Sequence, residues 1–186
     1  MLNYPISTMK IISLRLSGLK LIQPAVFHDA RGFFKESYHA PRYHDLGVIS
    51  PFVQDNHSFS QRDVIRGMHF QSTPGQHKLV WVIQGKIFDV AVDLRKDSPT
   101  FGQWEGVYLD GETQQQLFIP AGFAHGFCVL SPEGAHVSYK VSTPYDAQTE
   151  KTFRYDDPTV RIEWPVKNPI LSDRDKTAPT FQEVTQ

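Results

Sequence analysis

Short apolar or alternating runs, broken every few residues by Gly, Pro, Asp or Ser, fill most of this 186-residue chain. Such runs predict β-strands separated by turns. Only residues 41–46 and 172–178 favour helices, the second because Ser172 and Asp175 form a helix-start signature. Strands are expected over residues 10–16, 19–28, 32–39, 52–60, 64–71, 78–84, 86–94, 104–109, 115–120, 125–130 and 136–142. Many short, evenly spaced strands with almost no helix predict an all-β sandwich or barrel.

Side chains alternate between the two faces of a strand, so the sequence indicates which residues share a face. Alternation places Asp89 on the same face as the apolar residues Ile87 and Ala91. His125 and Tyr139 each share a face with apolar neighbours in their own strands. Together with Lys78, these residues predict a ring of polar groups that points into one barrel interior.

A β-bulge and a tight turn are also predicted. Strict alternation puts Arg66 and His69 on opposite faces, and Gly67 between them is a residue at which a β-bulge can turn both inward. Gln84-Gly85 is a tight-turn signal, which predicts a hairpin between the strands at 78–84 and 86–94.

Composition fits one packed domain. Apolar residues make up 40% of the chain and charged residues 21%, and the net charge is −1. The domain is expected to span 1–186, with residues 1–8 as an extension and about 144–186 as a C-terminal segment that packs on the barrel. The single cysteine, Cys128, lies in an apolar run and is expected to be a small buried residue.

The distribution of charged and apolar residues along the chain also argues against several partners and locations. The chain has no basic stripe, so no nucleic-acid partner is expected. No apolar run approaches the roughly 20 residues of a membrane span, and the N-terminus lacks the layout of a signal peptide. A cytoplasmic protein without a membrane partner is therefore expected.

His69, Lys78 and His125 form an unusual set of reactive residues. An imidazole can remove a proton from carbon, and an ammonium group can stabilise the negative charge that results. His125 ends a Pro-x-Gly-x-x-His motif, which is the second half of a cupin signature. Metal-binding cupins use His and Glu ligands, but here Gln71 and Lys78 stand where further ligands are expected. The set favours enolate chemistry without a metal ion.

Each of these residues could also have a purely structural role, and the sequence pattern alone does not decide between the structural and the catalytic role. His69 can be a hydrogen-bonded histidine of the core, and Lys78 a lysine that extends to the surface along an apolar stem. Tyr139 can be a core aromatic residue. Residues 173–175 have the composition of a solvated run of charges.

Two further segments suggest ligand binding. Arg31 follows a turn, and its guanidinium is suited to bidentate contact with phosphate. Residues 54–57 form a polar cluster inside a strand of apolar and aromatic residues, which is unusual for a core-facing segment and is compatible with the lining of a sugar site. The chain has no Gly-rich phosphate loop and no Gly-x-Ser-x-Gly nucleophile motif.

A series of motifs follows in order along residues 27–179. They are Asp29-Ala-Arg-Gly-Phe-Phe, Gln54-Asp-Asn-His-Ser, Val64-Ile-Arg-Gly-Met-His-Phe-Gln, His77-Lys-Leu-Val, Phe88-Asp-Val-Ala-Val-Asp-Leu-Arg, Ser98-Pro-Thr-Phe-Gly, Ile119-Pro-Ala-Gly-Phe-Ala-His-Gly-Phe and Ile170-Leu-Ser-Asp-Arg-Asp. By their number and order the chain resembles the dTDP-4-dehydrorhamnose 3,5-epimerase family.

The resemblance implies a cupin-like jelly-roll barrel with an N-terminal strand arm and a short helical C-terminal segment. It also implies a homodimer that exchanges N-terminal strands, a dTDP-4-keto-6-deoxyhexose substrate, and no cofactor or metal ion. The family's general base falls on His69, oriented by Asp175, and its general acid falls on Tyr139. Lys78 matches the residue beside the C4 oxygen.

Further positions match residues that hold the nucleotide and the sugar, some of them across the dimer. They are Arg31, Glu36, Gln54, Asp55, Asn56, Arg66, His125, Glu150 and Arg174. Relatives with similar residues invert one carbon only, so a mono-epimerase or isomerase of a related nucleotide sugar is the alternative activity. Alternatives of another class are a non-catalytic sugar-binding cupin and a metal-dependent cupin oxygenase.

Overall fold

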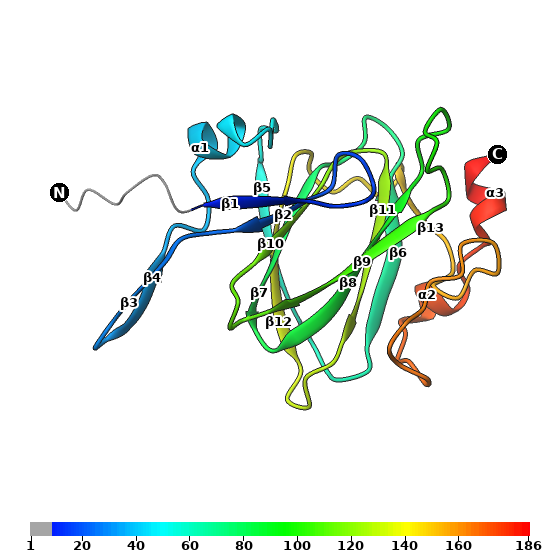
Figure 1. The fold of residues 1–186 in the computed structure, drawn as a ribbon. Helices are drawn as coiled ribbons and strands as arrows, with labels where there is room; N and C mark the ends of the chain where they lie inside the picture. Colours follow the sequence, from blue (N-terminus) through cyan, green and yellow to red (C-terminus); the bar gives the residue numbers. More distant parts are fainter. Residues whose placement is uncertain (1–8) are drawn as a thin grey trace.

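The computed structural model describes residues 9–186 (Figure 1). The predicted extension over residues 1–8 lies outside the described residues. Within 9–186, no helix is both long and apolar enough to span a membrane. In chain order the elements are β1 (Lys10–Ser13), β2 (Lys20–Gln23), β3 (Val26–Asp29), β4 (Gly32–Lys35), α1 (Ala40–Asp45), β5 (Gln54–Ser60), β6 (Ile65–Gln71), β7 (Lys78–Gln84), β8 (Lys86–Asp93), β9 (Trp104–Asp110), β10 (Gln116–Ile119), β11 (Phe123–Val129), β12 (Ala135–Val141), β13 (Glu150–Thr152), α2 (Asp173–Lys176) and α3 (Phe181–Thr185).

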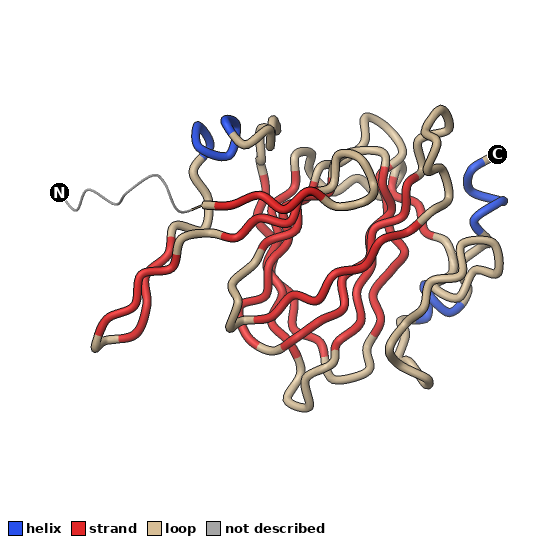
Figure 2. The backbone as a smooth tube through the Cα atoms, viewed as in Figure 1, coloured by secondary structure: helices blue, strands red, loops and turns tan. Residues whose placement is uncertain are grey.

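Two antiparallel sheets facing each other form the body of the protein. One sheet has the strand order β1-β2-β10-β7-β12-β5, and the other has the order β13-β6-β11-β8-β9. Figures 1 and 2 show the sheets curving around a common interior. The predicted jelly-roll fold is confirmed, although the described strands form two open sheets rather than one closed barrel.

The predicted hairpin at Gln84-Gly85 is wrong. β7 pairs with β10 and β12, whereas β8 pairs with β11 and β9. The chain turns sharply at Gly85, where φ is +89°, and crosses from one sheet to the other. A Cβ at Gly85 would lie 2.4 Å from the carbonyl oxygen of Gly134, so only glycine fits this crossing.

The interior between the sheets holds the main apolar core. Its buried members include alternate residues of the facing strands, such as Val80 and Val82 from β7 and Ile87 and Ala91 from β8. Tyr139 packs against this core from β12. The predicted alternation is therefore confirmed for these strands, and the inward face of β8 carries Asp89 in the middle of the core, fully buried.

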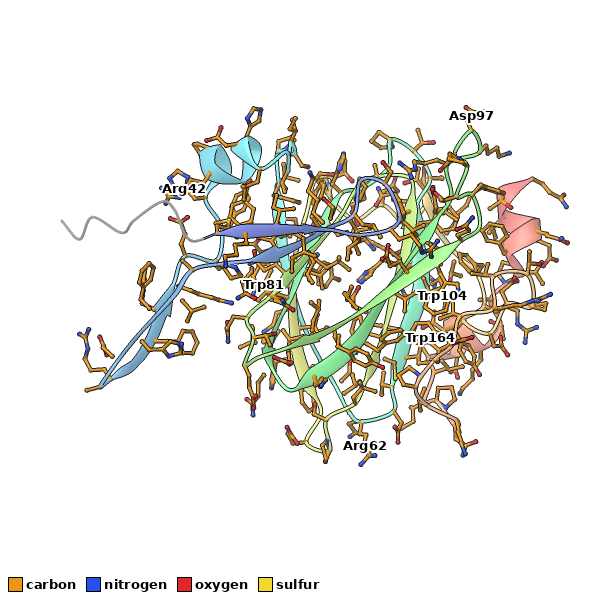
Figure 3. All side chains as sticks on the ribbon, in the orientation of Figure 1. Arg42, Arg62, Trp81, Asp97, Trp104 and Trp164 are labelled. Atoms are coloured by element: carbon orange, nitrogen blue, oxygen red, sulfur yellow. The ribbon has the colours of Figure 1, made fainter. Side chains whose placement is uncertain are left out.

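The outer face of the five-stranded sheet is covered by the C-terminal segment. Phe153 and Phe181 from this segment pack on Met68 and Phe88 of the sheet. Phe88 also meets Trp104 and Trp164 edge-on, at ring-centroid distances of 6.4 and 6.2 Å. Figure 3 labels the two tryptophans, which lie on the side of the molecule near the C-terminal segment. β8 is thus buried on both faces from its second residue onward.

Two elements of the C-terminal segment were missed by the sequence analysis. β13 has only three residues, too few for alternation to be recognised. α3 begins with a capping box, in which the side chain of Thr180 accepts from the backbone of Glu183 and the Glu183 carboxylate accepts from the backbone of Thr180. That Thr-x-x-Glu signal was present in the sequence.

An arm projects from the body near the N-terminus. The predicted strand over 19–28 is divided at Pro24 into β2, which joins the six-stranded sheet, and β3. β3 pairs with β4 to form a separate two-stranded hairpin that extends away from both sheets (Figures 1 and 2). The aromatic side chains of Phe33 and Phe34 on this arm are exposed.

The irregularity predicted at Gly67 is present in β6. His69 lies opposite His125, whereas Arg66 lies opposite Phe127, so three steps along β6 match two steps along β11. The extra residue turns both Arg66 and His69 to the interior. At this point β6 and β11 approach so closely that a Cβ on Gly67 would lie 2.6 Å from the Cα of Gly126.

We expect Gly67→Ala to lower the free energy of unfolding by about 3 kcal/mol or more, because strain at positive φ adds to a backbone clash. The φ of Gly67 is +131°. Urea unfolding followed by circular dichroism measures the effect.

Gly32→Ala is the matched control. Gly32 has a φ of +127°, but a Cβ there meets no atom of the described residues within 4 Å. Gly32→Ala should lower the free energy of unfolding only by the strain at positive φ. Equal losses of unfolding free energy in the two variants would contradict the proposed clash at Gly67.

Candidate active site

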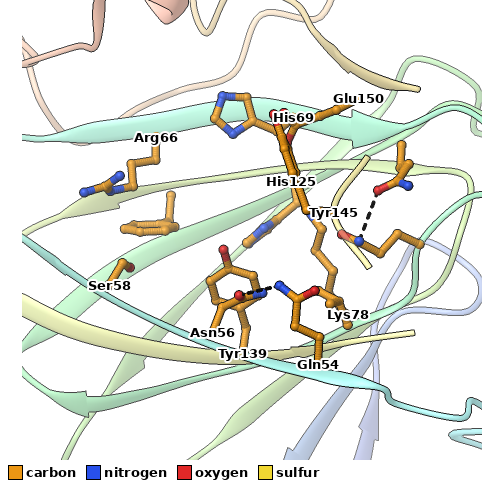
Figure 4. Close-up of a pocket in the computed structure, with 14 residues that line it drawn as sticks. Gln54, Asn56, Ser58, Arg66, His69, Lys78, His125, Tyr139, Tyr145 and Glu150 are labelled. Carbon is orange, nitrogen blue, oxygen red and sulfur yellow. Dashed lines mark hydrogen bonds between the residues drawn. The ribbon is translucent and has the colours of Figure 1, made fainter. Parts of the chain in front are cut away.

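A cavity of about 420 Å³ opens between the two sheets (Figure 4). Its size is that of a small-molecule site. β6, β11 and β13 form one wall, and β5, β7 and β12 form the other. The lining residues are Gln54, Asn56, Ser58, Arg66, His69, Gln71, Gln76, Lys78, His125, Phe127, Tyr139, Val141, Tyr145 and Glu150.

His69 and Asp175 form a hydrogen-bonded pair on the first wall. His69 Nε2 lies 2.7 Å from Asp175 Oδ1, although the residues are 106 positions apart in the chain. Asp175 is buried on α2, and its backbone N–H donates to the side chain of Ser172, the N-cap. The solvated-run interpretation of residues 173–175 is therefore wrong for Asp175.

The Asp175 carboxylate is suited to orienting the imidazole. Burial alone would raise the pKa of Asp175, but hydrogen bonds from His69, Ser172 and the Gly67 backbone hold it below its ordinary value. An ionised carboxylate accepts the Nε2–H proton of His69, which leaves Nδ1 of a neutral ring as the basic nitrogen.

Lys78 reaches the cavity from the first residue of β7. Burial lowers the pKa of its ammonium group from 10.5 to about 8, against the opposing attraction of the Glu150 and Asp89 carboxylates. A lysine whose pKa is close to neutrality, inside a partly enclosed cavity, fits a catalytic role better than the surface interpretation.

His125 and Asp89 form a second imidazole–carboxylate pair. His125 Nε2 lies 2.9 Å from Asp89 Oδ1 and 3.0 Å from Oδ2. Burial lowers the pKa of His125 even though Asp89 acts to raise it, so the ring is neutral at pH 7. His125 and His69 are cross-strand neighbours, and each has its own aspartate.

Tyr139 faces His69 from the opposite wall, because β12 and β6 belong to different sheets. Figure 4 shows the phenol on one side of the cavity and the imidazole on the other. Burial raises the pKa of Tyr139, so the phenol keeps its proton at neutral pH and can donate it. A substrate between the walls would have a base on one face and an acid on the other.

Other polar side chains surround these groups. Arg66 Nε donates to Ser60 Oγ at 2.7 Å, which holds the guanidinium at the cavity wall. Gln54 Nε2 donates to Asn56 Oδ1 at 2.8 Å. Glu150 lines the cavity and accepts from Arg174 Nη1 at 2.5 Å, so Arg174 reaches the site through Glu150.

Four predicted ligand-binding residues do not line this cavity: Arg174, which contacts Glu150, and three residues that lie farther away. Asp55 is on the outer face of β5, where it pairs with Lys140 Nζ at 2.6 Å, because alternation turns it away from Gln54 and Asn56. Arg31 lies on the projecting arm beside Asp29, and Glu36, just past the arm, pairs with Arg42.

Alternation could have found four lining residues that were not predicted as site residues. Each lies two positions beyond a predicted residue on the same face of its strand, and they are Ser58, Gln71, Phe127 and Val141. Gln76 and Tyr145 come from loops, whose direction alternation does not give. Within residues 9–186, no three His, Cys, Asp or Glu side chains gather in an arrangement that could hold a metal ion.

Comparisons with known proteins show which family this chain resembles in sequence and fold. The family described as dTDP-4-dehydrorhamnose 3,5-epimerase matches residues 13–183. The dTDP-4-dehydrorhamnose 3,5-epimerase of Shigella flexneri is 47% identical over 175 residues, which cover 93% of this chain and 96% of that protein. A dTDP-4-dehydrorhamnose 3-epimerase of Streptomyces niveus is 41% identical over 91% of this chain and 83% of that protein.

A solved structure is similar throughout the fold. It is the dTDP-6-deoxy-D-glucose-3,5-epimerase of Legionella pneumophila in complex with dTDP-4-keto-L-rhamnose. Its TM-score is 0.90 at 48% identity, and the match covers 94% of this chain and 93% of that chain. The present chain belongs to the dTDP-4-dehydrorhamnose 3,5-epimerase family.

Proposed function

We propose that this protein epimerises dTDP-4-dehydro-6-deoxy-D-glucose at C3 and C5 to give dTDP-4-dehydro-L-rhamnose, without a cofactor. The observation that carries the proposal is the placement of His69 and Tyr139 on opposite walls of one cavity that also contains Lys78. The names of the Shigella and Legionella relatives support the substrate and the double inversion.

The reaction begins with removal of a proton from carbon. The C4 ketone of the substrate acidifies the C–H bonds at C3 and C5, because the electrons left behind delocalise onto the carbonyl oxygen. His69 is the base, and Asp175, 2.7 Å from its Nε2, keeps the proton on that nitrogen and the Nδ1 lone pair free. The same carboxylate stabilises the imidazolium that forms.

Lys78 stabilises the enolate. Its ammonium group lies in the low-dielectric cavity, where attraction to a developing oxyanion is stronger than in water. Tyr139 then donates a proton to the opposite face of the carbon, which inverts the centre. The substrate is neither oxidised nor reduced overall, so this sequence needs no nicotinamide and no metal ion.

The remaining polar residues are assigned to binding. Arg66 supplies a cation for the diphosphate, while Gln54, Asn56 and His125 contact the sugar or nucleotide from the cavity wall. Glu150 and Arg174 close one side as an ion pair. The cytoplasmic location and a role in cell-surface polysaccharide synthesis stay predictions.

The Streptomyces niveus relative, a 3-epimerase, favours one alternative activity, inversion at a single carbon. Incubation with dTDP-4-dehydro-6-deoxy-D-glucose in D₂O separates the possibilities. Deuterium at both C3 and C5 supports the proposal, and deuterium at one carbon indicates a mono-epimerase. Binding of the nucleotide sugar without deuterium uptake would indicate a non-catalytic cupin.

We expect Tyr139→Phe to keep solvent exchange at C3 and C5 but to slow inversion by about 10²–10⁴-fold, the usual contribution of a general acid. Exchange persists because His69 still removes and returns a proton on one face. Mass spectrometry measures exchange, and proton NMR measures inversion. Tyr108→Phe, at an exposed tyrosine outside the cavity, is the control; full inversion by Tyr139→Phe would assign the acid elsewhere.

We expect Lys78→Met to be inactive yet more stable than the wild type at pH 7, by at most about 3 kcal/mol. The folded state lowers the pKa of Lys78 from 10.5 to about 8, so holding the charged form costs stability at neutral pH. Urea unfolding at several pH values measures the difference.

The sign of the pH dependence follows from this shift. Between pH 8 and 10.5 the unfolded chain retains the Lys78 proton and the folded protein has lost it, so this residue's contribution to stability rises with pH. The rise should vanish in Lys78→Met and persist in Lys167→Met, a control at an exposed lysine. Wild-type activity should fall as pH rises through about 8.

The arm supports the further proposal of a homodimer. Arg31 and Glu36 lie outside the chain's own cavity, and the arm extends away from both sheets with Phe33 and Phe34 exposed. In the proposed dimer, the arm of one protomer packs on the other and brings Arg31 and Glu36 to its cavity.

We expect mixed dimers of Arg31→Ala and His69→Ala protomers to regain activity. In a mixed dimer one site carries both substitutions and the other carries neither. Random pairing from an equal mixture should give about a quarter of wild-type activity, since half of the dimers are mixed. Each variant alone should stay nearly inactive, and an unrestored mixture would show that Arg31 acts on its own protomer.

A further inference from the structure

The buried carboxylate of Asp89 has no place in the chemistry described so far. Asp89 is fully buried in the middle of β8. Both of its oxygens face the same atom, Nε2 of His125, at 2.9 and 3.0 Å. An ion buried in a core is costly unless a specific partner or function retains it.

This contact determines which nitrogen of His125 carries the proton. A carboxylate is an acceptor, so Nε2 must donate to it. Since the ring is neutral, Nδ1 is then unprotonated. His125 lines the cavity, so Asp89 determines that its imidazole presents an acceptor, rather than a second N–H donor, to its remaining neighbours.

Asp89 contacts His125, and His125 lines the same cavity as Lys78, so the carboxylate charge lies close enough to favour the ammonium form of Lys78. The ionisable side chains that share the cavity with Lys78 are Glu150 from β13, His125 from β11, His69 and Arg66 from β6, Tyr139 from β12 and Tyr145 from the loop after β12. Glu150 and Asp89 are the carboxylates that favour the ammonium form of Lys78. Arg174 offsets the charge of Glu150 at 2.5 Å, whereas the partner of Asp89 is a neutral imidazole.

We propose that Asp89 is a positioning residue for the epimerisation, which fixes His125 as the Nε2–H tautomer and supplies the buried negative charge that keeps Lys78 protonated. The assignment of Lys78 to enolate stabilisation rests on the proposed function. The arrangement of Asp89, His125 and Lys78 in the unliganded protein is independent of that function.

Asp89→Asn is the first test. The pH at which kcat falls on the alkaline side should move down by about one unit, corresponding to a tenfold loss in the charged-to-neutral ratio of Lys78 at a given pH. KM should change little. A purely structural role would lower stability and kcat without moving this pH, and that result would overturn the proposal.

Asp93→Asn is the matched control. Asp93 lies on the same face of the same strand and is also fully buried, but its carboxylate pairs with Arg95, Ser98 and Thr100 outside the cavity. Asp93→Asn should lower the melting temperature and leave the pH dependence of kcat unchanged. Asp89→Glu, which keeps the charge, should restore most of the alkaline activity.

A measurement on the wild-type protein avoids any variant that fails to fold. In ¹⁵N-histidine-labelled, unliganded protein, His125 should show a protonated Nε2 and a bare Nδ1 at pH 7. A proton on Nδ1 would overturn the proposal. This readout also holds if the keto sugar is not turned over, so failure of the proposed function and failure of the Asp89 assignment are distinguishable.

Discussion

The close approach of β6 and β11 is the contact on which the site depends. Gly67 and Gly126 meet where a side chain on either would clash, and the extra residue that β6 accommodates there turns Arg66 and His69 to the same side. Without it, alternation would leave the guanidinium and the imidazole on opposite faces of the sheet. A packing detail between two backbones therefore decides whether the imidazole of His69 and the guanidinium of Arg66 share one cavity.

A second constraint is the placement of charge in an apolar interior. The facing strands bury Val80, Ile87 and Ala91, and Lys78, Asp89 and Tyr139 lie among the same side chains. Burial in this interior lowers the pKa of Lys78 and raises that of Tyr139, and holding polar groups there costs stability. The outer layer of Phe88, Phe153 and Phe181 supplies apolar burial that can offset that cost.

Much of the fold and of the site could be predicted from local pattern. Alternation located the inward faces of β8, β11 and β12, including Tyr139, and the ordered motifs contain His69 and Lys78, which line the cavity. Contacts between distant segments could not be predicted in this way. The 106-residue separation of His69 and Asp175 hides their pairing from any local pattern, and the crossing at Gly85 has the same signal as a hairpin. Asp55 was grouped with its motif neighbours although strand geometry turns it outward.

The position of Asp175 has a consequence for how activity is acquired. The two sheets are formed largely by residues before 142, but the carboxylate that pairs with His69 belongs to α2, near the end of the chain. The His69–Asp175 contact can therefore form only after α2, close to the end of the chain, has been made and has docked beside β6.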